Sequence, residues 1–305
     1  MRIVISGGSG LIGTALRAAL VARGDHVISL VRPSSQQHGP SDVAWDPREG
    51  TIDVAKLNEL GPIDAVVHLA GAGIADKRWS VERRAEILDS RVSSTSLLAT
   101  AITGLATLPP AFVSGSAIGI YGDRGDEVLT EDSSPGEGFL AEVCQRWEEA
   151  AAPAVAAGVR TTFARTGIVL STAGGALKKQ LPLFRAGLGG PLSSGTQWFS
   201  WIGIADEVGA LIAMIDDATL VGPVNLTAPE PVTNAMFTTE LSHALHRPSV
   251  FRVPRFALKA ALGAELTEEA LLASQRVLPR RLEASTFSFT SPDLPDALQS
   301  ILAGG

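Results

Sequence analysis

The fold class is decided by the stretch Arg2-Ile3-Val4-Ile5-Ser6-Gly7-Gly8-Ser9-Gly10-Leu11-Ile12-Gly13. A short apolar run ends at Ser6, glycines follow with the spacing G-x-x-G-x-x-G, and Leu16 and Leu20 then recur at helical spacing. Gly24 stands where such a helix ends, and residues 26–31 predict a second buried strand. The order strand, glycine loop, helix, strand is that of a βαβ unit.

The same alternation continues along the chain. Further strands are predicted at residues 63–69, 111–116, 160–170 and 224–227, and helices at 82–103, 140–151 and 205–216. Strands separated by helix-length patterns predict a parallel sheet with helices on both faces. We therefore expect an α/β fold of the Rossmann type, with a doubly wound parallel sheet and a small C-terminal domain.

The character of the sequence changes after residue 170. Glycines crowd a region that holds Trp198 and Trp201, and helical patterns recur at 237–245, 256–262 and 268–277. We expect two domains. The first is a nucleotide-binding Rossmann domain formed by residues 1–170 and 205–229, and the second is a small substrate domain formed by 171–204 and 230–305.

Composition limits the classes of function. The chain has 305 residues, a net charge of −7, 45% hydrophobic residues and a single cysteine, Cys144. This balance predicts a folded globule and excludes an internal disulfide. Nucleic acids and anionic membranes favour basic surfaces, so neither is expected as the partner. No apolar run is long enough to span a bilayer and no signal peptide precedes the first strand, so we expect a cytoplasmic protein.

The glycine loop has the spacing that a bound dinucleotide requires. Gly7 would make the tight turn, Gly10 would let the backbone approach a diphosphate, and Gly13 would let the helix pack closely on the sheet. The N–H groups that open the helix, together with the helix dipole, attract an anion. The alternative is a structural turn that binds nothing, but the strand before the loop and the helix after it favour binding. The residues expected to contact the cofactor are Gly7, Ser9, Gly10, Leu11, Ile12 and Gly13.

The end of the second strand indicates which dinucleotide binds. A site that prefers NAD places an acidic residue there, about 20 residues beyond the glycines. This chain reads Leu30-Val31-Arg32-Pro33-Ser34-Ser35. A guanidinium can grip a 2′-phosphate bidentately, whereas a carboxylate would repel it. We therefore predict NADP(H) as the cofactor, with Arg32 on the 2′-phosphate; the alternative is an ordinary surface arginine.

Motifs along the whole chain carry a family resemblance. They are Gly7–Gly13, Asp64-Ala65-Val66-Val67-His68-Leu69-Ala70-Gly71, Lys77-Arg78-Trp79, Ser90-Arg91, Ser114-Gly115-Ser116-Ala117, Tyr121-Gly122-Asp123, Arg165-Thr166-Gly167, Leu188-Gly189-Gly190-Pro191 and Gln275-Arg276-Val277-Leu278-Pro279. On these residues the chain resembles the atypical, extended short-chain dehydrogenase/reductases known as epimerase family proteins. These are NAD-dependent epimerase/dehydratase-like, and some carry the label of cell-division inhibitor. The resemblance implies no particular substrate.

The resemblance implies further contacts with the cofactor. Leu69 and Ala70 are expected against the adenosine and diphosphate, and Val169 beside the nicotinamide. Glu86 and Arg91 occupy positions on the following helix that meet the cofactor in relatives. The alternatives are core packing for the three apolar residues and a solvated helix face for the two charged ones.

The sequence departs from its relatives at one motif. They tend to read Trp-Ile-His-Ile-Asp-Asp where this chain has Trp201-Ile202-Gly203-Ile204-Ala205-Asp206. Any role of a histidine is therefore lost at Gly203. Asp206 is expected to remain as an N-cap or first-turn acid of the next helix.

A second departure concerns catalysis. Ordinary members of the superfamily use Tyr-x-x-x-Lys, in which the lysine ammonium makes a tyrosine of pKa about 10 a usable acid or base. The single tyrosine here is Tyr121, and the residue four positions later is Gly125. By alignment with the superfamily, the place of the pair falls near Leu140 and Cys144. Ser116 keeps the place of the superfamily serine, so Ser116 and Tyr121 are the candidate proton-transfer residues. The alternatives are a strand-end hydroxyl and a packed ring.

Two functions of different class remain open. The first is an NADP(H)-dependent oxidoreductase or epimerase-like enzyme acting on a small carbonyl or hydroxyl compound that the sequence does not identify. The second is a non-catalytic regulator that senses the redox state of NADP(H). The missing Tyr-x-x-x-Lys pair disfavours a sugar-nucleotide epimerase. His243 and His246 lack a second cluster of ligands, so no metal site is expected. A homodimer is left open.

Overall fold

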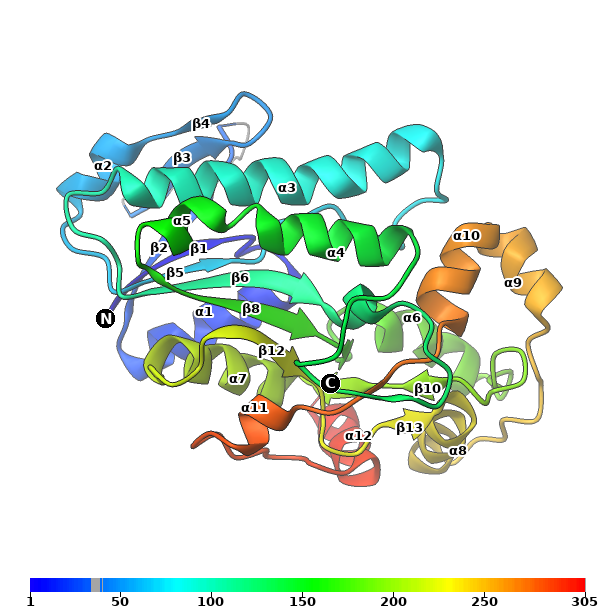
Figure 1. Ribbon diagram of the computed structural model, residues 1–305. Helices are drawn as coiled ribbons and strands as arrows, with labels where there is room; N and C mark the ends of the chain where they lie inside the picture. Colours follow the sequence, from blue (N-terminus) through cyan, green and yellow to red (C-terminus); the bar gives the residue numbers. More distant parts are fainter. Residues whose placement is uncertain (34–38, 40, 305) are drawn as a thin grey trace.

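The protein is built around one eight-stranded sheet. The computed structural model describes residues 1–33, 39 and 41–304 (Figure 1). The strands of the sheet are β1 (Arg2–Ser6), β2 (His26–Val31), β3 (Val43–Asp46), β4 (Thr51–Ile52), β5 (Ala65–His68), β6 (Ala111–Ala117), β8 (Arg160–Thr166) and β12 (Gly222–Leu226). Their order across the sheet is β12-β8-β6-β5-β1-β2-β3-β4, and every pair is parallel except β3 with β4. The predicted α/β class is confirmed.

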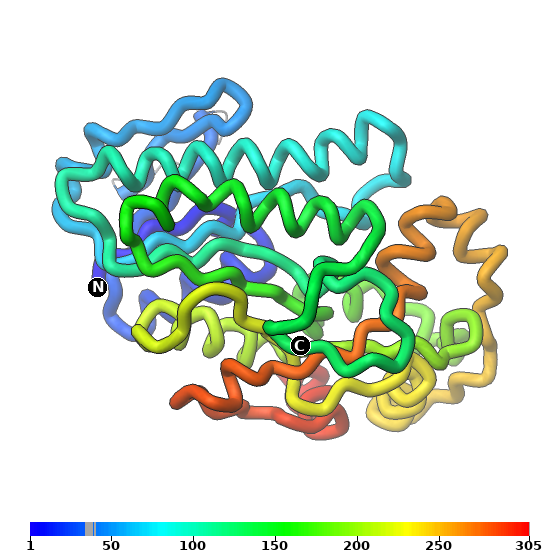
Figure 2. Tube along the Cα trace, in the orientation of Figure 1, coloured from blue at the N-terminus to red at the C-terminus, as the bar shows by residue number. Residues whose placement is uncertain are grey.

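Helices cover both faces of this sheet (Figures 1 and 2). On one face lie α1 (Leu11–Arg23) and α7 (Ile204–Asp216), and on the other lie α3 (Val81–Thr103), α4 (Phe139–Glu149) and α5 (Ala152–Ala156). The first face packs Leu16, Leu20 and Leu211 against the strands. The second packs Leu98 and Phe112 among the residues of its own core. The sheet is therefore doubly wound, because each face must bury its apolar side chains under helices.

The strand predicted at 160–170 is broken in the structure. β8 ends at Thr166, and β9 (Ile168–Leu170) leaves the sheet to pair in parallel with β11 (Trp201–Gly203). Gly167 lies at the break, where a Cβ would stand 2.7 Å from the backbone oxygen of Ser200. The segment around Ser200 thus packs closely on Gly167, where the predicted strand divides into β8 and β9. The local sequence pattern gives no sign of this long-range contact.

Residues beyond β9 form a further apolar cluster. The elements in this part of the chain are α6 (Gly175–Arg185), β10 (Trp198–Phe199), β13 (Val232–Thr233), α8 (Asn234–Leu245), α9 (Arg255–Leu262), α10 (Ala264–Leu266), α11 (Arg280–Glu283) and α12 (Leu294–Ala303). Phe199 stacks on Phe237 with ring centroids 4.4 Å apart, and Trp201 is fully buried in the same cluster. The division of the chain into two domains stays a prediction.

The helix predicted at 268–277 is wrong. The structure instead has a π-helix at Thr267–Leu272, and then β14 (Arg276–Val277), which pairs in parallel with β7 (Val128–Leu129). The pattern was misread because the apolar residues of the π-helix and the strand follow one another without a turn signal. The remaining short elements are α2 (Val54–Glu59) and a 3₁₀ helix at Ile118–Tyr121. Among the described residues no helix has the length and apolarity to cross a membrane.

Candidate active site

The glycine loop joins β1 to α1 under tight steric limits. Gly7 has φ +73°, and a Cβ there would stand 2.6 Å from the carbonyl carbon of Leu69. A Cβ on Gly13 would overlap the Gly7 carbonyl oxygen. By contrast, a Cβ on Gly10 would touch only the Gly7 oxygen, at 3.4 Å, an ordinary van der Waals distance. Packing within the protein thus requires Gly7 and Gly13, whereas Gly10 leaves open backbone that a ligand can approach.

The first turn of α1 is open to an anion. Gly10 is its N-cap, with no side-chain capping hydrogen bond and no acidic residue in the first turn. Ser9 and Gly10 are exposed, and Leu11 and Ile12 are half-buried. Unsatisfied N–H groups and the positive end of the helix dipole suit a diphosphate. The residues present therefore fit a dinucleotide. That Gly7, Ser9, Gly10, Leu11, Ile12 and Gly13 contact it stays a prediction.

Three other apolar residues were predicted to contact the cofactor, and they lie beside the glycine loop or on β9. Leu69 and Ala70 follow β5 directly, and the Leu69 N–H donates to the Ser6 oxygen at 3.2 Å. Val169 lies on β9 and packs against the core beside α7. All three are half-buried, so each can pack below and contact a ligand above.

Arg32 follows the last residue of β2 and is exposed. Its position past the second strand is where a residue reads the adenosine ribose in this fold. Ser34 and Ser35, the hydroxyls that the sequence places beside it, lie outside the described residues.

Glu86 and Arg91, predicted together on one helix, lie in different surroundings. Glu86 is exposed on α3 and pairs with Arg83 at 2.6 Å. Arg91 turns inward, where its Nη1 donates to the backbone oxygens of Ala72 at 2.9 Å and Ile87 at 3.0 Å. Burial lowers the pKa of the Arg91 guanidinium. The structure thus does not bring these two side chains together.

Ser116 lies near the C-terminal end of β6 and is buried to 5% exposure. Its Oγ donates to Glu148 Oε1 at 2.7 Å. Glu148 in turn accepts from Arg165 through both carboxylate oxygens, at 2.8 Å and 2.9 Å. Sequence reasoning missed this ion pair, because Arg165, the penultimate residue of β8, and Glu148 of α4 come together only in the folded sheet.

Tyr121 lies at the far end of the same network. The ring is fully buried, and its OH donates to Asn225 Oδ1 at 2.8 Å and accepts from Arg165 Nη1 at 3.0 Å. Burial raises the pKa of this phenol, with Arg165 acting in the opposite direction. The structure therefore connects the two predicted hydroxyls through Arg165 and does not bring them side by side. The Tyr121 hydroxyl proton is already used in the hydrogen bond to Asn225.

The positions expected for the Tyr-x-x-x-Lys pair lie on α4. Leu140 is half-buried, and its N–H donates to Glu269 Oε2 at 2.8 Å. Cys144 is buried, and burial raises the pKa of its thiol to about 12. A thiol of such high pKa is a poor nucleophile at neutral pH, so Cys144 serves as a small buried side chain.

His68 is a second residue that sequence reasoning missed. It ends β5, fully buried, with Nδ1 at 2.5 Å from Ser6 Oγ and Nε2 at 3.0 Å from Ser94 Oγ. Burial lowers the pKa of its imidazole to about 3, so the ring is neutral at physiological pH. Since Ser6 ends β1, this contact ties together the two strands beneath the glycine loop.

The first turn of α7 carries two buried acids. Asp206 accepts from the N–H groups of Thr290 at 2.7 Å and Ser291 at 3.1 Å, so the expected first-turn acid also holds the C-terminal segment. Glu207 accepts from Thr166 Oγ1 at 2.8 Å, and its Oε2 has no partner in the described part of the chain. Burial raises the pKa of Glu207 to about 8.

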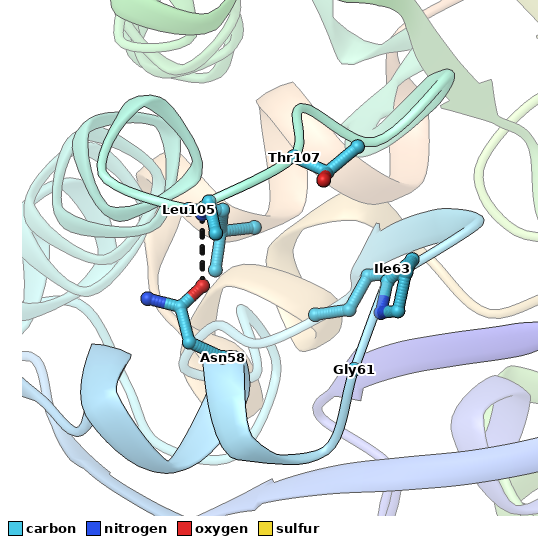
Figure 3. Close-up of a pocket in the computed structure, with 7 residues that line it drawn as sticks. Asn58, Gly61, Ile63, Leu105 and Thr107 are labelled. Carbon is cyan, nitrogen blue, oxygen red and sulfur yellow. Dashed lines mark hydrogen bonds between the residues drawn. The ribbon is translucent and has the colours of Figure 1, made fainter.

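Two hollows lie at different ends of the fold. One, of about 220 Å³, is bordered by Asn58, Ile63 and Leu105 near the N-terminal end of β5 (Figure 3). There Asn58 Oδ1 accepts from the Ala106 N–H at 2.9 Å. Ligands of open parallel sheets bind beyond the C-terminal ends of the strands, so this hollow is at the wrong end for the cofactor.

The second hollow, of about 140 Å³, lies at the end of the molecule where α4 begins. It is lined by Gly119, Gly122, Asp123, Glu137, Leu140, Ala141, Glu268, Glu269 and Ala273. It includes Leu140, one of the two positions expected for the missing pair. The π-helix of the C-terminal part of the chain also lines this hollow. It lies against the N-terminus of α4, where Glu269 accepts a hydrogen bond from the Leu140 N–H.

Comparison with known proteins identifies the family of this chain. Residues 3–226 match the model of the NAD dependent epimerase/dehydratase family, and residues 253–301 match a domain of unknown function, DUF1731. The epimerase family protein Mb2239 of Mycobacterium bovis is 44% identical over 300 residues, covering 97% of this chain and 96% of its own. The mouse epimerase family protein SDR39U1 is 37% identical, covering 99% and 100%.

A solved structure is also similar over the full length. The crystal structure of the human epimerase family protein SDR39U1 (isoform 2) with NADPH is 34% identical, covers 99% of both chains and has a TM-score of 0.88. The UDP-glucose 4-epimerase of Thermus thermophilus, solved with NAD, is 18% identical with a TM-score of 0.74 and shows the fold alone. The chain belongs to the NAD dependent epimerase/dehydratase family and, within it, to the atypical short-chain dehydrogenase/reductases named epimerase family proteins.

Proposed function

We propose that this protein binds NADP(H) and uses it to oxidise or reduce a small carbonyl or hydroxyl compound. The observation that carries the proposal is the open first turn of α1 above Gly10, combined with Arg32 past the end of β2. The NADPH in the crystal structure of a relative that is 34% identical supports the choice of the phosphorylated cofactor. When bound, the cofactor supplies or accepts a hydride.

In this proposal different residues bind different parts of the cofactor, which lies in the crevice beyond the C-terminal ends of the strands. The glycine loop holds the diphosphate, Arg32 the 2′-phosphate, and Leu69 and Ala70 border the adenosine side. Val169, Glu86 and Arg91 complete the expected set of cofactor residues. We assign no contact between Glu86 and Arg91, since the structure separates them.

Hydride transfer at carbon needs a matched proton transfer at oxygen. Ser116 is the proposed group for this proton, because its Oγ donates to Glu148 and keeps lone pairs free to accept from a substrate hydroxyl. In the oxidative direction the substrate proton passes to Ser116 Oγ as the Ser116 proton passes to Glu148. Tyr121 acts in this proposal through Arg165, which holds Glu148 in place, and is a positioning residue.

A panel of aldehydes and ketones tests the proposal directly. Purified protein is incubated with NADPH and each compound, and absorbance at 340 nm follows oxidation of the cofactor. Turnover above background with at least one compound, reduced at least about 100-fold in Ser116→Ala, is the expected result. Turnover that Ser116→Ala leaves unchanged would remove Ser116 from the mechanism.

One observation favours the non-catalytic alternative. Both candidate hydroxyls donate inside the protein, Ser116 to Glu148 and Tyr121 to Asn225, so neither proton is aimed at a ligand. A regulator of this kind would bind NADPH, turn over no member of the panel, and bind a protein partner differently with NADPH and NADP⁺. The panel therefore distinguishes the two functions.

A further inference from the structure

Arg91 is a half-buried cation that lacks a carboxylate partner in the part of the chain that the structure describes. Both of its hydrogen bonds use Nη1, which donates to the backbone oxygens of Ala72 and Ile87. By contrast, the buried Arg165 is held by Glu148 through two hydrogen bonds, and the buried Arg83 of α3 pairs with Glu86. Withdrawing a cation from water without a counter-charge costs free energy of folding. Such a charge is therefore a candidate for binding a ligand or stabilising a reacting group.

Three elements enclose the Arg91 guanidinium. Its Cζ lies 4.9 Å from the ring centroid of Trp147 on α4, in a cation–π contact. A Cβ built on Gly71, in the loop after β5, would stand 3.3 Å from the same Cζ. The Arg91 charge also acts on Cys144, lowering the pKa of a thiol that burial raises. Arg91 therefore projects from α3 into the space between the β5 loop and the face of α4 that carries Cys144 and Trp147.

The order of the strands shows which half of a dinucleotide this space would meet. The strand order is β6-β5-β1-β2, so the chain builds outward from β1 first through β2 and later, on the other side, through β5 and β6. β1 therefore lies at the topological switch point of the sheet. Arg32, past the end of β2, marks the adenosine side. The second nucleotide half lies across the crevice, on the side of β5 and β6. Arg91 lies between the loop that follows β5 and the helix that follows β6, and so on the nicotinamide side.

We propose that the Arg91 guanidinium supplies, at the nicotinamide half of the crevice, the positive charge that lysine supplies in enzymes with a Tyr-x-x-x-Lys pair. In this chain the expected lysine position is Cys144, a buried thiol that carries no positive charge. The inference rests on the proposed binding of NADP(H). The oxidised nicotinamide ring is positively charged and the reduced ring is neutral, so a nearby guanidinium favours the reduced cofactor. The same charge would stabilise negative charge that develops on a substrate oxygen.

Calorimetric titration with three probes tests this inference on the full chain. The probes are NADPH, NADP⁺ and 2′-phospho-ADP-ribose, which lacks the nicotinamide. The wild-type protein is expected to bind NADPH about fivefold to tenfold more tightly than NADP⁺. Arg91→Gln should bring that ratio close to one and leave affinity for 2′-phospho-ADP-ribose within about twofold. Arg91→Lys should keep the preference for NADPH.

Arg146→Gln is the matched control, because it removes an exposed charge from α4 one residue before Trp147. It should keep the wild-type ratio. If thermal unfolding shows that Arg91→Gln does not fold, the wild-type ratio and Arg91→Lys still decide the question. A wild-type ratio near one overturns the inference. So does an equal loss for all three probes in Arg91→Gln, which would place the guanidinium on the diphosphate. Failure of the wild-type protein to bind any probe overturns the proposed function itself.

Discussion

Ser116 Oγ donates to Glu148 Oε1 at 2.7 Å, although the two residues lie 32 positions apart in the chain. Glu148 is the point at which three elements meet, since β6 brings Ser116, α4 carries Glu148 and β8 brings Arg165. The network continues from Arg165 to Tyr121. Ser116, the proposed proton-transfer residue near the C-terminal end of β6, is thus held by an ion pair that is almost fully buried.

Breaking that ion pair should cost more stability than removing the hydroxyl. Glu148→Gln leaves the Arg165 charge buried without its carboxylate, and we expect a loss of about 3 kcal/mol in the free energy of unfolding. Ser116→Ala should lose about 1 kcal/mol. Glu142→Gln, in an exposed pair with Arg146, should change stability by less than about 0.5 kcal/mol. Urea unfolding of the three variants measures the difference; equal losses for Glu148→Gln and Glu142→Gln would refute the prediction.

Gly10→Ala should separate binding from folding. The fold has room for its Cβ, which would meet only the Gly7 oxygen at 3.4 Å, and the residue has φ −76°. We expect the unfolding midpoint to stay within a few degrees, while affinity for NADPH falls at least about tenfold because the new methyl group occupies the diphosphate approach. Gly13→Ala should instead destabilise the fold, because its Cβ overlaps the Gly7 oxygen. Undiminished NADPH binding by Gly10→Ala would contradict this account of the loop.

His68 should make the protein less stable in acid. Its pKa is about 3 in the folded state and 6.5 in its ordinary state, so the unfolded chain takes up a proton that the folded chain refuses. The contribution is complete above pH 6.5 and is lost as pH falls toward 3, at about 1.4 kcal/mol per pH unit. His68→Gln should therefore show a shallower fall in stability over this window. The comparison is made by urea unfolding at several pH values, and parallel curves for the two proteins would exclude the effect.

Glu207 should act in the opposite sense. Its pKa is raised from 4.5 to about 8, so the folded chain holds a proton that the unfolded chain releases. Stability from this group is present below pH 4.5 and is lost as pH rises toward 8. Glu207→Gln, which keeps an amide oxygen for the Thr166 hydroxyl, should gain stability over wild type as pH increases through this window. A difference between the two proteins that does not change with pH would show that Glu207 is not buried as a neutral acid.

The first half of the fold was predictable because its signals are local. β2 and α3 lie within one residue of their predicted bounds, and Gly24 ends α1 with φ +91° as expected. Buried parallel strands and long helices carry strong periodic patterns that few tertiary contacts override. The C-terminal part lacks them. α6 begins among glycines and contains Pro182. The π-helix at Thr267–Leu272 contacts the start of α4, where Glu269 accepts from the Leu140 N–H, and this long-range contact has no local signal in the sequence.

The positions of the glycine loop and of Arg32 were predictable, because each follows a strand at a fixed spacing. Their contacts with the cofactor stay a prediction. The partners of Ser116 could not, because Glu148 and Arg165 become neighbours only through the lateral pairing of β6 with β8. For the same reason the burial of His68 and Glu207 was invisible in the sequence, since polar residues at strand ends and helix starts are usually solvated.

Titration of the purified protein with NADPH and NADH by calorimetry is the most direct test of the central claim. If Arg32 binds the 2′-phosphate as proposed, the wild-type protein should bind NADPH about 10- to 100-fold more tightly than NADH. Arg32→Ala should weaken NADPH binding by that factor and leave NADH binding nearly unchanged. No heat with either cofactor, or equal losses for both in Arg32→Ala, would contradict the account.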